Sequence, residues 1–130
     1  MDALTEGRYA GEGLLSEAEF GRSREAVTIA SGAGVIKPGT VLGKYTSGAN
    51  SGKYAPAPAA AADPDVGNQV AVAIALYGCD ATSADQKIAV IARDAQWNGN
   101  TLTYEASVDT DNEKAAKAVQ LAAVGIVVRN

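Results

Sequence analysis

The residues whose spacing could support chemistry in this chain are acidic. Asp63 and Asp65 lie close together in a loop, and a pair of carboxylates can divide acid and base roles when burial separates their pKa values. Further along, Asp109, Asp111 and Glu113 alternate like the first ligands of a calcium-binding loop. The chain contains no histidine, so the commonest general base and metal ligand is missing.

Neither acidic group is predicted to form a catalytic or metal-binding site. Nothing apolar surrounds Asp63 and Asp65 in the sequence, which favours solvated turn residues. A calcium loop needs glycine at its sixth position and glutamate at its twelfth, where this chain has Lys114 and Gln120. The acids that follow Thr110 fit a helix capping box better. We therefore expect no catalytic residue, no metal and no cofactor, and keep a small enzyme using these acids only as an alternative.

Trp97 is the single tryptophan of the chain and precedes Asn98-Gly99. One interpretation is that its ring stacks on a ligand such as a glycan. The other is a contact at a rim or between subunits, because large aromatic side chains dominate protein interfaces.

Composition limits the classes of function. The 130 residues predict a single domain, and the 47% apolar share contains few aromatics and much alanine, so the core is thin and an oligomer is favoured. The net charge of −4 excludes a basic face for nucleic acid, and no apolar run reaches the length of a membrane span. The single Cys79 excludes an internal disulfide, and the acidic N-terminus predicts no signal peptide.

Alternating apolar residues predict several strands. They begin with a short strand at Val27 and Ile29 and continue over residues 40–46, 70–76 and 87–93. In the third of these, large side chains alternate with alanine, which predicts a strand buried on both faces. A Gly-, Pro- and Ala-rich loop at residues 47–68 separates the second strand from the third, and Tyr54 marks a short strand within it.

The last third of the chain carries two local signals. Asn98-Gly99 predicts a hairpin that joins residues 87–93 to a strand at 101–108, because both residues tolerate positive φ. Thr110 and Glu113 predict a capping box and a helix that ends at Gly125, followed by a final strand at 126–128. The predicted fold class is β-rich mixed α/β with one late helix, and the globular domain covers residues 25–130.

Residues 1–24 mix charge with glycine and show neither a helical nor a strand period. Such a segment buries too little to offset its ordering entropy, so we expect it to be mobile in solution. It is either a disordered terminus or a flexible arm that becomes ordered on a partner. Its apolar anchors are Tyr9, Leu14, Leu15 and Phe20.

Several short stretches, taken in order, resemble the head decoration protein family of tailed bacteriophages. They are GLLSE at 13–17, SREAVTI at 23–29, PGTVLG at 38–43, AIAL at 73–76 with Asp80, and IAVIAR at 88–93. The resemblance covers residues 6 to 108. Each stretch is short, so the evidence for the resemblance is that the stretches occur in the same order along the chain.

The resemblance implies a β-clip-like fold and a homotrimer at three-fold and quasi-three-fold sites of the expanded phage head. It also implies that the N-terminal arm adds a strand to the major capsid protein and that no reaction is catalysed. The location is the outer capsid surface, after synthesis in the host cytoplasm. The alternative is another virion or surface binding module, either a tail component or a glycan binder using Trp97. The predicted capsid-binding residues are Tyr9, Leu14, Leu15, Phe20, Arg22, Ser23, Arg24 and Glu25, with Arg22 and Arg24 pairing capsid carboxylates.

Overall fold

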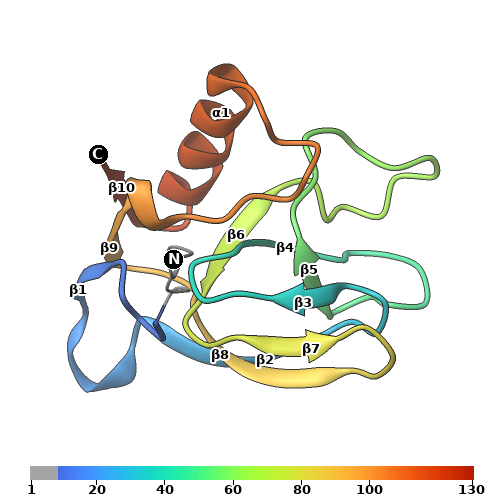
Figure 1. The fold of residues 1–130 in the computed structure, drawn as a ribbon, viewed down its shortest axis with the longest axis horizontal. Helices are drawn as coiled ribbons and strands as arrows, with labels where there is room; N and C mark the ends of the chain where they lie inside the picture. Colours follow the sequence, from blue (N-terminus) through green and yellow to red (C-terminus); the bar gives the residue numbers. More distant parts are fainter. Residues whose placement is uncertain (1–8) are drawn as a thin grey trace, which may run out of the picture.

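The computed structural model describes residues 9–130 as ten strands, two short 3-10 helices and one α-helix (Figure 1). In chain order the elements are β1 (Leu14–Glu17), η1 (Glu19–Gly21), β2 (Arg24–Ile29), β3 (Gly34–Ile36), β4 (Val41–Lys44), β5 (Tyr54–Pro56), β6 (Ala71–Ala75), β7 (Cys79–Ala81), β8 (Gln86–Ile91), β9 (Ala95–Asn98), η2 (Gly99–Thr101), α1 (Asp111–Ala122) and β10 (Ile126–Arg129).

Five strands close into a barrel in the order β2-β5-β4-β6-β8. All barrel pairs are antiparallel except β2 with β5, which run parallel at Ile29 and Tyr54. A three-stranded sheet, β1-β9-β10, and a two-stranded sheet, β3-β7, complete the fold. This β-rich architecture with one late helix confirms the predicted fold class.

Strand β6 is buried on both faces, as its alternation of large and small residues predicts. Ala73 and Ala75 belong to a cluster to which all five barrel strands contribute. Ile74 and Leu76 belong to a second cluster, which β6 shares with Trp97 of β9 and with side chains of α1 and β10. The helix and the three-stranded sheet are therefore attached to the barrel through this second core.

The predicted hairpin at Asn98-Gly99 is wrong. Asn98 is extended (φ −73°, ψ 110°), and its side chain accepts a hydrogen bond from Asn100 N, which starts η2. Residues 101–108 form no strand and make one isolated bridge, between Thr40 and Thr103. The physical reason is long-range pairing: β9 lies between β1 and β10, and both edges are occupied by strands that are distant in sequence.

The arm predicted for residues 1–24 also differs from the structure. Residues 1–8 lie outside the described part of the chain, but Leu14–Glu17 form β1, where the sequence shows no strand period. The strand pairs antiparallel with β9, and Asn98 N donates to Gly13 O at 2.7 Å. Local periodicity does not reveal this strand because its stability comes from a partner about eighty residues away.

Candidate functional site

Strand β1 lies at the edge of its sheet (Figure 1). Among the strands of residues 9–130 it pairs with β9 alone, so its other edge has no strand beside it. An edge strand presents backbone N–H and C=O groups that another chain can pair with. This open edge lies in the segment that the sequence predicts to bind a partner.

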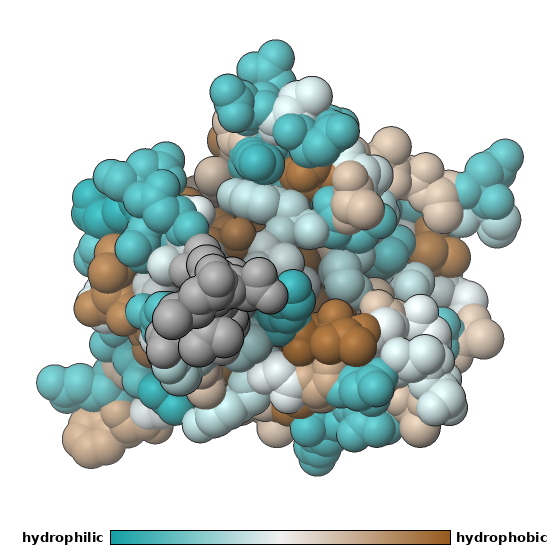
Figure 2. Space-filling model, viewed as in Figure 1, coloured by the Kyte–Doolittle hydropathy of each residue, from teal (hydrophilic) through white to brown (hydrophobic). Residues whose placement is uncertain are grey.

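The predicted anchors of this segment divide into two groups. Leu14 packs against the second core and is unavailable to a partner. Leu15 is 54% exposed, and Tyr9 and Phe20 are more exposed still. In Figure 2 apolar atoms protrude at the lower left, the corner that η1 occupies in Figure 1. The structure thus exposes three apolar side chains, one within β1 and two in the segments that flank it.

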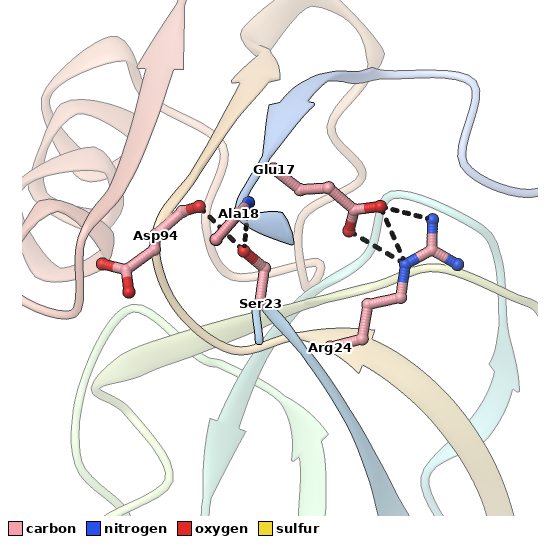
Figure 3. Close-up of polar contacts among 5 residues, drawn as sticks. All are labelled: Glu17, Ala18, Ser23, Arg24 and Asp94. Atoms are coloured by element: carbon pink, nitrogen blue, oxygen red, sulfur yellow. Dashed lines mark hydrogen bonds and ion pairs between the residues drawn. The ribbon is translucent and has the colours of Figure 1, made fainter. Parts of the chain in front are cut away.

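The turn between β1 and β2 holds Phe20 in an unusual conformation. Its φ of 61° lies in the left-handed region, which a bulky residue rarely adopts, and Gly21 follows with a φ of 71°. Ser23 fixes the base of the turn: its fully buried hydroxyl accepts from Ala18 N and donates to Asp94 O, both at 2.8 Å (Figure 3). Ser23, predicted as a binding residue, is therefore a buried support of the turn.

The charged residues of the segment already have partners within the chain. Arg24 Nε and Nη2 donate to the Glu17 carboxylate at 2.8–3.1 Å (Figure 3), and this hydrogen bonding lowers the pKa of Glu17 and raises that of Arg24. Glu25 accepts from Arg93 at 2.7 Å. Arg22 is more exposed, with Asp94 3.9 Å away. Of the two predicted capsid-pairing arginines, Arg22 is the one with the weaker internal partner.

Tyr77 is a surface residue that the sequence did not single out. Gly11 N donates to Leu76 O at 2.9 Å, which places the turn after Tyr9 beside Tyr77. Tyr77 is half-exposed and contributes, after Glu17, to the raised pKa of Arg24. We call Tyr9, Leu15, Phe20, Arg22 and Tyr77, together with the open edge of β1, the β1 surface. No local pattern in the sequence reveals Tyr77, because the contact joins segments about 65 residues apart.

A shallow hollow of about 430 Å³ lies next to the η1 turn, on the outer side of the three-stranded sheet. Ser16, Ala18, Arg22, Gln96 and Val127 contribute to its lining. The hollow is continuous with the β1 surface through Arg22, so a partner strand at this edge would find both backbone groups and a recess beside it.

Trp97 takes neither role that the sequence suggests. Its side chain is fully buried in the second core, and Nε1 donates to Thr101 Oγ1 at 3.0 Å. A ring enclosed in this way cannot stack on a glycan or form a rim contact, so the glycan-binding interpretation based on Trp97 is wrong.

The acidic groups behave as the sequence predicts. Asp63 and Asp65 are exposed, and Asp65 Oδ1 accepts from Gly67 N at 2.8 Å as a turn residue. Thr110 and Glu113 form the capping box of α1.

Within residues 9–130, no three His, Cys, Asp or Glu side chains gather as a metal site would require. No helix in this part of the chain is long and apolar enough to cross a membrane.

No significant match is found among curated proteins. The sequence profile of the family described as "Bacteriophage lambda head decoration protein D" matches residues 3–126, which is nearly the whole chain. The chain therefore belongs to the lambda head decoration protein family, the structural proteins that decorate phage heads.

Proposed function

We propose that this chain binds the expanded phage head as a homotrimer at three-fold and quasi-three-fold sites and stabilises the shell. Membership of the head decoration family supports association with the capsid. The net charge of −4 also suits a protein that coats the outer surface and does not bind DNA.

The observation that carries the proposal is the open edge of β1 beside three exposed apolar side chains. A strand of the major capsid protein pairs with this edge, so that the sheet β1-β9-β10 gains a fourth strand. Main-chain hydrogen bonds supply affinity, and Tyr9, Leu15 and Phe20 supply apolar contacts. Burying each anchor contributes about 1.5–3 kcal/mol before ordering costs are subtracted.

Stabilisation of the shell follows from the number of contacts. Once one chain of a trimer is bound, the other two meet the shell at a high effective concentration, and avidity exceeds single-chain affinity by about 10²–10⁴. Because the trimer spans several capsid subunits, their separation requires that these contacts break. A small protein that catalyses nothing thereby opposes the pressure of packaged DNA.

The test is binding of purified protein to expanded heads that lack decoration. Deleting the first 22 residues is unsuitable, because β1 is part of the fold and covers Trp97. We therefore compare the wild type with the double variant Leu15→Asp/Phe20→Asp. The control is Val35→Asp, which places one such charge at a valine that is 67% exposed on β3.

We expect the wild type and the control to saturate at three copies per three-fold site. The double variant should bind at least about tenfold more weakly, because two charges replace exposed apolar anchors that binding to the shell would bury. Equal binding by the double variant would show that the β1 surface is not the contact. No saturable binding by the wild type would refute the decoration function itself.

A further inference from the structure

A pocket of about 230 Å³ opens at the surface where the loop between β5 and β6 leaves and rejoins the barrel. Its apolar lining includes Ala55, Pro56 and Pro58, and its polar lining consists of Tyr45, Asn68 and Glu105. We call it the Glu105 pocket. None of these residues belongs to the β1 surface, and in Figure 1 β1 lies at the left of the molecule whereas β5 lies towards the right. The pocket is therefore separate from the proposed shell contact.

Asn68 leaves a buried acceptor without a partner at this pocket. The residue is only 8% exposed, and within residues 9–130 its Oδ1 atom accepts no hydrogen bond. A buried oxygen normally accepts from protein, ordered water or a ligand, because leaving it unpaired costs free energy. The amide of Asn68 thus favours an occupant that carries hydrogen-bond donors.

Glu105 gives the pocket a negative charge. Its Oε2 atom accepts from the backbone N and the hydroxyl of Ser107, whereas the described residues place no donor on Oε1. No lysine or arginine in this part of the chain lines the pocket. The charge of Lys117 acts on Glu105 from α1, but its ammonium group is bound by the carbonyls of Pro58 and Gln69. One carboxylate oxygen therefore remains for a cationic occupant.

Hydrogen bonds hold the walls of the pocket in place. At the first end of the loop, Pro58 O accepts from Lys117 Nζ at 2.6 Å, and Ala59 N donates to the Ser107 hydroxyl at 2.9 Å. The same ammonium group donates to Gln69 O, which fixes the second end of the loop. Walls that are fixed in advance reduce the ordering cost of binding.

We propose that the Glu105 pocket binds the side chain of an arginine that another protein presents. The guanidinium group has several donors in one plane, so it reaches the Glu105 carboxylate and, after a rotation of the amide, Asn68 Oδ1 together. The methylene groups lie against Pro56 and Pro58, and the ring of Tyr45 adds attraction for a cation. The volume of about 230 Å³ is smaller than the usual small-molecule site of about 300–1,000 Å³ and suits one side chain.

The experiment is an NMR titration of the isotope-labelled full chain with Nα-acetyl-arginine amide. Nα-acetyl-citrulline amide is the control ligand, because it has nearly the same shape and no charge. Glu105→Gln removes the charge of the pocket but keeps an acceptor for Ser107. Glu19→Gln is the matched control variant, because Glu19 is an exposed glutamate in η1. The emission of the buried Trp97 checks that each variant is folded.

We expect the arginine probe to shift the amide signals of Ala55, Asn68 and Glu105 and to approach saturation at millimolar concentrations. The wild type and Glu19→Gln should behave alike. The citrulline probe on the wild type, and the arginine probe on Glu105→Gln, should each bind at least about tenfold more weakly, because the charged hydrogen bonds are lost.

Three results would overturn the site. They are the absence of a saturable shift with the arginine probe, equal affinity for the arginine and citrulline probes, and wild-type affinity in Glu105→Gln, which would place the cation elsewhere. This inference goes beyond the proposed function and does not rest on it. The titration uses no phage heads, so failure of the Glu105 pocket and failure of head binding are separate outcomes.

Discussion

Gly13 occupies a position where no side chain fits. A Cβ atom there would overlap Trp97 Nε1 and Thr101 Oγ1, the two groups joined by the hydrogen bond that holds the indole ring in place. Gly13→Ala must therefore displace the ring or the start of β1. We expect the free energy of unfolding to fall by about 1–3 kcal/mol, as for other overpacked cores.

The measurement is chemical denaturation followed by the emission of Trp97, which should also shift to the red in the folded variant as the ring meets water. Ser16→Ala is the control, because Ser16 is an exposed residue of the same strand. A Gly13→Ala variant with wild-type stability and emission would show that β1 does not cover Trp97 in solution.

Lys117 is a residue whose burial gives a prediction about pH. Burial lowers its pKa from the ordinary 10.5, while the charges of Glu105 and Glu113 act in the opposite direction. Between the lowered pKa and 10.5 the folded chain binds fewer protons at this site than the unfolded chain. The contribution of Lys117 to the free energy of unfolding therefore rises with pH in that window.

Lys117→Met removes this pH-dependent contribution and leaves the carbonyls of Pro58 and Gln69 without their donor. We expect a loss of about 1–3 kcal/mol at neutral pH, with a flatter dependence on pH than in the wild type. Urea denaturation from pH 7 to 10 measures both quantities. Lys114→Met serves as the control, since Lys114 lies outside the core over the ring of Tyr104. If the free energies of unfolding of the wild type and Lys117→Met change with pH in parallel, the prediction of a buried Lys117 ammonium with a lowered pKa is wrong.

At the scale of elements, the sequence predicts local structure well and long-range pairing poorly. The capping box at Thr110 and the two-faced strand β6 are confirmed, because hydrogen bonds or side-chain alternation within a few residues determine them. The hairpin at Asn98-Gly99 is wrong, and β1 is missed, because β9 pairs with strands from both ends of the chain. The candidate site shows the same division: the exposed anchors are visible in the sequence, whereas the open edge and Tyr77 require the fold.

The capping box gives a prediction for α1 as a unit. Thr110 Oγ1 accepts from Glu113 N at 3.2 Å, and the Glu113 carboxylate accepts from Thr110 N at 3.1 Å. Thr110→Ala removes the first of these bonds, and we expect the free energy of unfolding to fall by about 0.5–2 kcal/mol in thermal or urea melts at pH 7. Asn112→Ala, in the exposed first turn, should change it little. If the two substitutions lower the free energy of unfolding equally, the hydrogen bond from Glu113 N to Thr110 Oγ1 makes no specific contribution to stability.

At the scale of the whole molecule, β1 is attached to the barrel through the second core, in which Leu14 takes part. This packing fixes the direction of the open edge of β1 relative to the barrel. In the trimer that we propose, the three β1 surfaces would therefore keep a fixed arrangement, which a three-fold site on a shell requires.

The proposed shell contact predicts how long the protein stays on the shell. The double variant Leu15→Asp/Phe20→Asp weakens the contact of every chain, and in a trimer the weakening is repeated at each contact that contributes to the multivalent gain of about 10²–10⁴. We expect it to leave decorated heads far faster than the wild type when unlabelled wild-type protein is added in excess, and the fraction of label retained over time measures this. Val35→Asp should be retained like the wild type, because Val35 is exposed on a different element. If the double variant is retained equally long, the β1 surface does not hold the protein on the shell.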